Sequence, residues 1–107
     1  MNDKELLELA AKAEGNTVEF DSEFNLTYRN FGTKYLWNPL CNDGDAFRLA
    51  VKLGIVIDAN DDCICIQYVI NNVAKKITVH EYDDVYVATR RAIVLAAAEI
   101  AKTKGEA

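Results

Sequence analysis

The sequence predicts an α+β protein in which a three-stranded antiparallel sheet is packed with helices. Apolar residues recur at helical spacing near both ends of the chain. Between them, three short apolar runs are separated by brief polar turns, as in a meander of strands. The 107 residues are 50% hydrophobic, which supplies one core and excludes a mainly disordered chain. We therefore expect a single domain over residues 1–107, with elements in the order α-(arm)-α-β-β-β-α.

The first helix is expected over residues 3–14, where leucines and alanines share one helical stripe. Asn2 or Asp3 can cap its start, and Gly15 suits its end. Residues 16–36 are interpreted as an arm that forms one or two short strands or an irregular cover over the core. Its aromatic residues indicate that it packs, and it could add a fourth strand to the sheet.

The second helix is expected over about residues 45–53, after a turn at 37–46 that contains the only proline. Asp43 or Asp45 would cap the helix, because an acidic side chain accepts from the free N–H groups of its first turn. Gly54 is the expected stop.

Three strands follow at residues 55–59, 63–70 and 73–82, and short turns between them make an antiparallel meander. Asn71 and Asn72 suit a two-residue hairpin turn, since asparagine tolerates left-handed geometry. The sheet should contribute these side chains to the core: Ile55, Ile57, Ile64, Ile66, Val69, Ile77 and Val79. Because the second strand is apolar on both faces, we expect helices on both faces or a partner chain.

The last helix is expected over residues 84–102, with Asp83 and Asp84 at its start. It is apolar over most of its girth from Val85 to Ile100, and such a helix must be buried on several sides. A chain of this size has few elements with which to do so. Together with the aromatic arm, this predicts a homodimer.

The charge balance argues against a nucleic-acid partner. Twelve basic and 17 acidic residues give a net charge of −5, whereas proteins that bind the phosphate backbone usually present a basic face. No apolar run has the roughly 20 residues of a membrane span. The N-terminus lacks the basic start of a signal peptide, and the three cysteines are interpreted as reduced thiols. We expect a cytoplasmic protein that does not contact membrane.

No catalytic motif occurs, so we predict no catalytic residues and no enzymatic activity. Asp58, Asn60 and Asp62 have the alternate spacing of a calcium loop, but the glycine and glutamate that the loop requires are missing. Cys63, Cys65 and His80 are too few ligands for a transition-metal site. We therefore expect no metal and no cofactor.

Seven residues are candidates for a binding site: Trp37, Asn38, Asp43, Asp45, Arg48, Arg90 and Arg91. Trp37 can be a recognition anchor or can fill a gap between helices. Arg48 follows Asp45 by three residues, so the two side chains can meet on the second helix. The adjacent arginines of the last helix can hold a carboxylate or phosphate, or can pair with Asp or Glu of this chain.

Two segments carry a family resemblance. WNPLCNDGDAFRLAVKL at 37–53 and ATRRAIVLAAAEI at 88–100 resemble the motifs of small tailed-phage and prophage proteins, and the opening MNDKELLELAAKA is also similar. On these motifs the chain resembles the phage α-β-α sandwich domain family over most of its length. The resemblance implies a phage or prophage accessory protein made in the bacterial cytoplasm, and it carries no catalytic assignment.

Two functions compete on these observations. The first is a non-enzymatic interaction module that binds a host or phage macromolecule, which fits the acidic charge and the lack of a catalytic motif. The second is a small-molecule or nucleotide binder that sequesters a signal, in which Trp37 would stack on the ligand and Arg48, Arg90 or Arg91 would hold phosphate.

Overall fold

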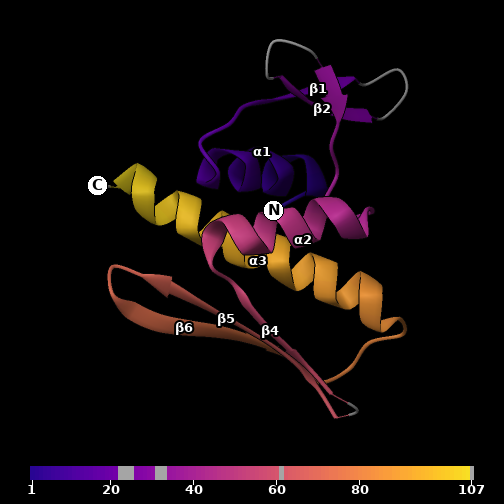
Figure 1. The fold of residues 1–107 in the computed structure, drawn as a ribbon, viewed down its shortest axis with the longest axis vertical. Helices are drawn as coiled ribbons and strands as arrows, with labels where there is room; N and C mark the ends of the chain where they lie inside the picture. The colour runs from indigo at the N-terminus through magenta and orange to yellow at the C-terminus, as the bar shows by residue number, and fades with distance from the viewer. Residues whose placement is uncertain (22–25, 31–33, 61, 107) are drawn as a thin grey trace.

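The computed structural model describes residues 1–21, 26–30, 34–60 and 62–106. Within them the chain forms three helices and two three-stranded antiparallel sheets (Figure 1). The helices are α1 (Asp3–Ala13), α2 (Asp43–Leu53) and α3 (Val85–Glu106). The small sheet contains β1 (Val18–Asp21), β2 (Leu26–Asn30) and β3 (Lys34–Leu36), and the main sheet contains β4 (Val56–Ala59), β5 (Ile64–Ile70) and β6 (Val73–Val79). The predicted fold class is confirmed.

The main sheet has the strand order β4-β5-β6, with both neighbouring pairs antiparallel. Asn71 and Asn72 form the turn between β5 and β6, with φ angles of 51° and 66°. Positive φ at both central residues matches the right-handed twist of the flanking strands, so the predicted hairpin is confirmed. Ile66 at the centre of the sheet pairs with Ile57 on one side and Ile77 on the other.

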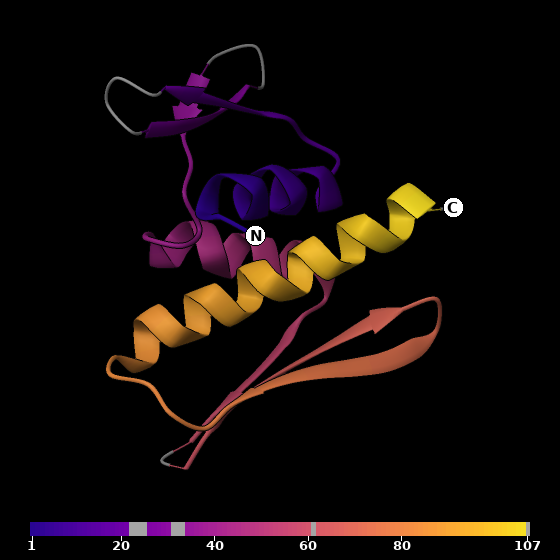
Figure 2. The same cartoon turned by 180° about the vertical axis from the view of Figure 1, so that it is seen from behind.

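Helix α3 lies between the main sheet and the other two helices (Figures 1 and 2). It contacts α1, α2 and β5 along its length. Its buried side chains include many alanines, which let neighbouring backbones approach closely: Ala92, Ala96, Ala97, Ala98 and Ala101. Most of the apolar girth of α3 therefore needs no second chain to cover it.

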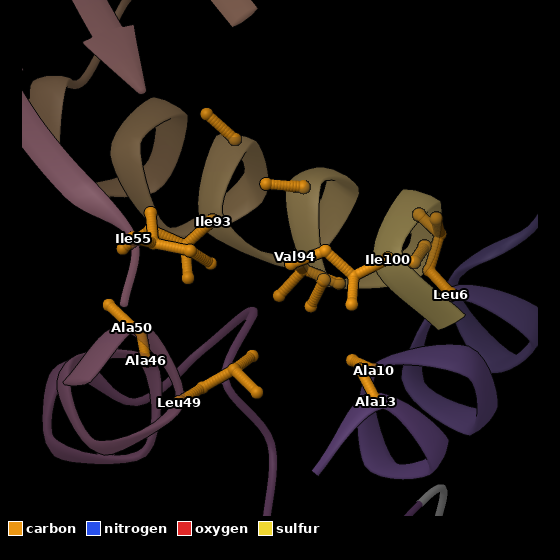
Figure 3. Close-up of a cluster of buried hydrophobic side chains, with 14 of the residues drawn as sticks. Leu6, Ala10, Ala13, Ala46, Leu49, Ala50, Ile55, Ile93, Val94 and Ile100 are labelled. Atoms are coloured by element: carbon orange, nitrogen blue, oxygen red, sulfur yellow. The ribbon is translucent and has the colours of Figure 1, made fainter. Parts of the chain in front are cut away.

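The core joins the three helices to one face of the main sheet (Figure 3). Leu6 and Ala10 of α1, Leu49 of α2, and Ile93 and Val94 of α3 all point into it. Each of these side chains is almost fully buried, so the three helices share one packed interior.

The helices cover only one face of the main sheet (Figures 1 and 2). Ile64 and Ile66 face α3 and are fully buried, whereas Val69 points the other way and is 58% exposed. Placing Val69 in the core was wrong, because alternate residues of a strand face opposite sides. Placing Ile57 in the core was also wrong, because it lies on the edge strand β4 and is 41% exposed. Of the two expected covers, helices on both faces or a partner chain, the first is wrong for the described residues.

The arm folds apart from the main sheet. β1, β2 and β3 pair only with one another, and β1 contacts α1. The helices separate the arm from the main sheet, so the fourth strand that the arm could have added does not form (Figure 1). Phe24 and Phe31, two of the aromatic residues that indicated packing, lie outside the described residues.

The ends of α1 and α3 agree only partly with the ends predicted from the sequence. Asn2 caps α1, and its side chain accepts from the backbone N–H of Glu5 at 2.8 Å. Asp84 accepts from the first backbone N–H groups of α3, as predicted. Helix α3 continues to Glu106 instead of ending at residue 102, because its last turns run beside α1. There the Lys104 Nζ donates to a carbonyl oxygen at the end of α1 at 3.1 Å.

Tyr68 gives the fold a dependence on alkaline pH. Burial raises the pKa of the Tyr68 hydroxyl, and the charge of Glu99 raises this pKa further. The folded state thus holds this proton more tightly than the unfolded state. The contribution of protonated Tyr68 to the free energy of unfolding is complete below about pH 10, the pKa of tyrosine in the unfolded state. This contribution is lost as the pH rises above that value.

As the pH is raised from 9 to 11, about one unit on either side of the usual tyrosine pKa, the free energy of unfolding of the wild type should fall. We expect it to fall less in Tyr68→Phe, which has no hydroxyl to titrate. Denaturant unfolding at a series of pH values measures this. Tyr86→Phe, at a solvent-exposed tyrosine, is the control. Identical pH dependence of the wild type and Tyr68→Phe would contradict the prediction.

Candidate binding site

The turn before α2 is held together by its own polar side chains. Trp37 is 3% exposed, and Pro39 beside it is fully buried. The backbone N–H of Asn38 donates to Asp45 Oδ2 at 2.9 Å, and the side-chain oxygen of Asn38 accepts from the N–H of Leu40 at 2.9 Å. The carboxylate of Asp45 thus reaches back from the helix and closes the turn.

Asn42 is the residue that caps α2. Its side-chain oxygen accepts from the N–H of Asp45 at 2.9 Å, so the prediction of Asp43 or Asp45 as the cap is wrong. An extended backbone at Asn42 aims its amide at the helix start, which leaves the Asp45 carboxylate available for the turn. The predicted contact between Arg48 and Asp45 is confirmed, with 2.8 Å between Nη2 and Oδ1.

The two adjacent arginines of α3 make different contacts. Arg90 donates from Nε to the carbonyl oxygen of Leu40 at 2.9 Å and from Nη1 to Asp43 Oδ1 at 2.6 Å. Its mostly buried guanidinium therefore fastens α3 to the turn before α2. Arg91 points instead toward α1, where it pairs with Asp3 at 3.0 Å on the surface.

An open recess of about 270 Å³ lies where α2, β4 and the first turns of α3 meet. We call it the α2–β4–α3 groove, and it is lined by Asp43, Ala46, Phe47, Ile57, Ala59, Val85, Tyr86, Thr89, Arg90 and Ile93. Most of these side chains are apolar, and the Asp43–Arg90 ion pair is the charged part of the lining.

Large apolar side chains at this groove remain open to solvent. Phe47 is 63% exposed, Tyr86 67% and Ile57 41%, and each comes from a different element. Beside them β4 is an edge strand, since among the described residues it pairs only with β5. Exposed apolar residues that gather at one recess mark an interaction site more often than single ones do.

The seven sequence-predicted residues fall into three places. Asp43 and Arg90 line the groove. Trp37, Asn38 and Asp45 hold together the turn before α2, where their contacts are structural. The remaining two, Arg48 and Arg91, lie on the surface in ion pairs with acidic residues of this chain.

The exposed apolar residues of the groove are not among the seven residues predicted from the sequence. Phe47 could have been found, because it lies off the helical stripe that buries Leu49 and Ala50 and so had to face outward. Tyr86 in the first turn of α3 is off the buried stripe in the same way. Ile57 carries no such signal, since its alternation places it on the inner face of the sheet.

Across the described ranges, no cluster of three or more His, Cys, Asp or Glu side chains is arranged to hold a metal ion. The three cysteines are free thiols, with Cys41 exposed and the other two half-buried. In the same part of the chain, no helix combines the length and apolarity needed to cross a membrane.

Comparisons with models of protein families, with curated proteins and with solved structures find no match to this chain. Because one fold serves many functions, the α+β arrangement assigns no activity by itself. Evidence on function comes instead from the α2–β4–α3 groove. Its apolar side chains, beside a strand edge that pairs on one side only, suit contact with another polypeptide.

Proposed function

We propose that this chain is a non-enzymatic interaction module that binds another protein through the α2–β4–α3 groove. The observation that carries the proposal is the exposure of Phe47, Ile57 and Tyr86 around one recess beside a strand edge. Aromatic residues are enriched at protein interfaces, and Tyr is among the residues that most often dominate the binding energy. A strand edge adds unpaired backbone N–H and C=O groups with which an extended segment can pair.

The sequence supports a setting for this function. Resemblance to the phage α-β-α sandwich domain family supports a phage or prophage accessory protein in the bacterial cytoplasm, with a host or phage protein as its partner. The net charge of −5 supports a protein partner over a nucleic acid. The proposal includes self-association as a homodimer, which accounts for large apolar side chains on the surface of a small chain.

The alternative, a small-molecule or nucleotide binder, has less support. Trp37 is buried in the turn and leaves no ring face on which a base could stack. Arg90 already bonds Leu40 and Asp43, and the rest of the groove is mainly apolar. At about 270 Å³ the groove is also slightly smaller than pockets that enclose drug-sized ligands, which begin at roughly 300 Å³.

Photo-cross-linking in cells tests the proposed function. A photoreactive phenylalanine analogue placed at Phe47 or Tyr86 should attach the chain covalently to a protein, because both side chains would lie inside the interface. The analogue at Val73 is the matched control, since Val73 is similarly exposed but lies on β6. Mass spectrometry identifies the attached species.

Attachment to a protein at the two groove positions, and not at the control, supports the proposal. Nucleic acid as the attached species would overturn it. The same conclusion follows if the groove positions give no more product than Val73.

A further inference from the structure

We infer that the partner at the groove is a second copy of this chain, with the two β4 strands paired antiparallel about a two-fold axis. This inference rests on the proposed function, because it names the occupant of the same groove. Antiparallel pairing about an axis perpendicular to the sheet joins the two main sheets edge to edge. It also keeps the helices of both copies on the same side of the joined sheet.

The two edges of the main sheet differ in what they allow. The central part of β6 carries Lys75 and Lys76, both exposed. Pairing two β6 strands would bring the lysines of both copies together, and charged side chains of this kind protect an edge from such pairing. The short β4 edge has instead the exposed apolar pair Val56 and Ile57. Of the two edges, β4 is the one that a second copy can approach without repulsion between lysines.

A two-fold axis at Ile57 gives a favourable register. Ile57 would face Ile57 of the second copy, and Val56 would face Asp58 of the second copy, so no two carboxylates lie directly opposite. Ile57 also lines the groove. The two grooves would therefore lie next to each other on the same face, with Phe47 and Tyr86 of each copy near β4 of the other.

Charge complementarity favours the same orientation. Lys52 in the last turn of α2 lies four residues before β4, whereas Asp58 is in the second half of β4 and Asp62 lies three residues beyond its end. An antiparallel arrangement brings the basic end of each β4 toward the acidic end of the other. Attraction between unlike charges at both ends would fix the register. A parallel approach would instead bring like charges together and be repelled.

The oligomeric state of the full chain tests the inference. Light scattering after size exclusion at micromolar concentration should give twice the chain mass of 11.9 kDa. Phe47→Asp and Ile57→Asp should each raise the dimer dissociation constant by roughly tenfold or more, because each places carboxylates in the apolar contact. Val73→Asp on β6 is the matched control and should remain dimeric. Both groove residues are exposed, so circular dichroism should show the fold retained.

A charge swap tests the orientation independently. Lys52→Glu should weaken the dimer, and adding Asp62→Lys to it should restore most of the lost affinity. A double variant that is no tighter than Lys52→Glu alone would overturn the antiparallel register.

Apart from the charge swap, two results would overturn the inference: a monomeric wild type, or a dimer that both groove variants retain. If the wild type is monomeric while a photoprobe at Phe47 captures a different protein, the second copy is excluded and the proposed function stands. If the chain is monomeric and the photoprobe captures nothing, both are overturned. A probe that captures a second copy of this chain supports both.

Discussion

Replacing Trp37 by alanine is expected to lower the free energy of unfolding by about 3–5 kcal/mol, the usual range for truncating a core aromatic. The side chain is 3% exposed and belongs to the packed core of the helices. Its removal leaves a cavity between the turn before α2 and that core. Chemical denaturation of the wild type and of Trp37→Ala measures the loss.

Phe47→Ala is the matched control for this variant. Phe47 is also aromatic but is largely exposed on α2, so its truncation should change the stability by no more than about 0.5 kcal/mol. The affinity for the partner should fall more in Phe47→Ala than in Trp37→Ala. A Trp37→Ala variant as stable as the wild type would show that the indole does not support the fold.

Replacing Asp45 by alanine should have the second-largest effect, a loss of about 1.5–3 kcal/mol, as for hydrogen bonds to charged groups. The Asp45 carboxylate is mostly buried and accepts from the backbone N–H of Asn38. Without it this N–H loses its partner and the turn before α2 is no longer closed. Thermal and denaturant unfolding of Asp45→Ala both report the loss.

Arg48→Ala separates the two contacts of Asp45. The arginine side chain is mostly exposed, so its ion pair with Asp45 should contribute less than about 1 kcal/mol. If Arg48→Ala costs as much as Asp45→Ala, the surface ion pair matters more than the turn. The prediction for Asp45 would then be wrong.

These variants divide the predicted site into a structural part and a part at the surface. Trp37, Asn38 and Asp45 hold the turn, and Arg90 fastens the turn to α3. Substitutions in this network should therefore reduce stability first and binding only as a consequence. Substitutions of Phe47 or Ile57 should do the reverse, since these side chains remain exposed in the single chain.

Features that depend on near neighbours could be predicted from the sequence. The three helices, the three strands of the main sheet and their turn at Asn71 and Asn72 all follow from spacing and residue type. So do the stop at Gly54, which adopts left-handed geometry, and the contact of Arg48 with Asp45 one helical turn away. In each case a few residues contain all the atoms that decide the conformation.

Features that depend on distant contacts were decided only by the tertiary structure. Asn42 rather than an aspartate caps α2, and the Asp45 carboxylate accepts instead from a backbone N–H seven residues earlier. The arm pairs with itself because the helices stand between it and the main sheet. Sequence spacing does not show which faces of the helices and the sheet pack together. It therefore does not show which apolar side chains remain exposed to solvent. Phe47 and Tyr86 are such residues, and they converge on one groove only because α2 and α3 pack side by side above β4.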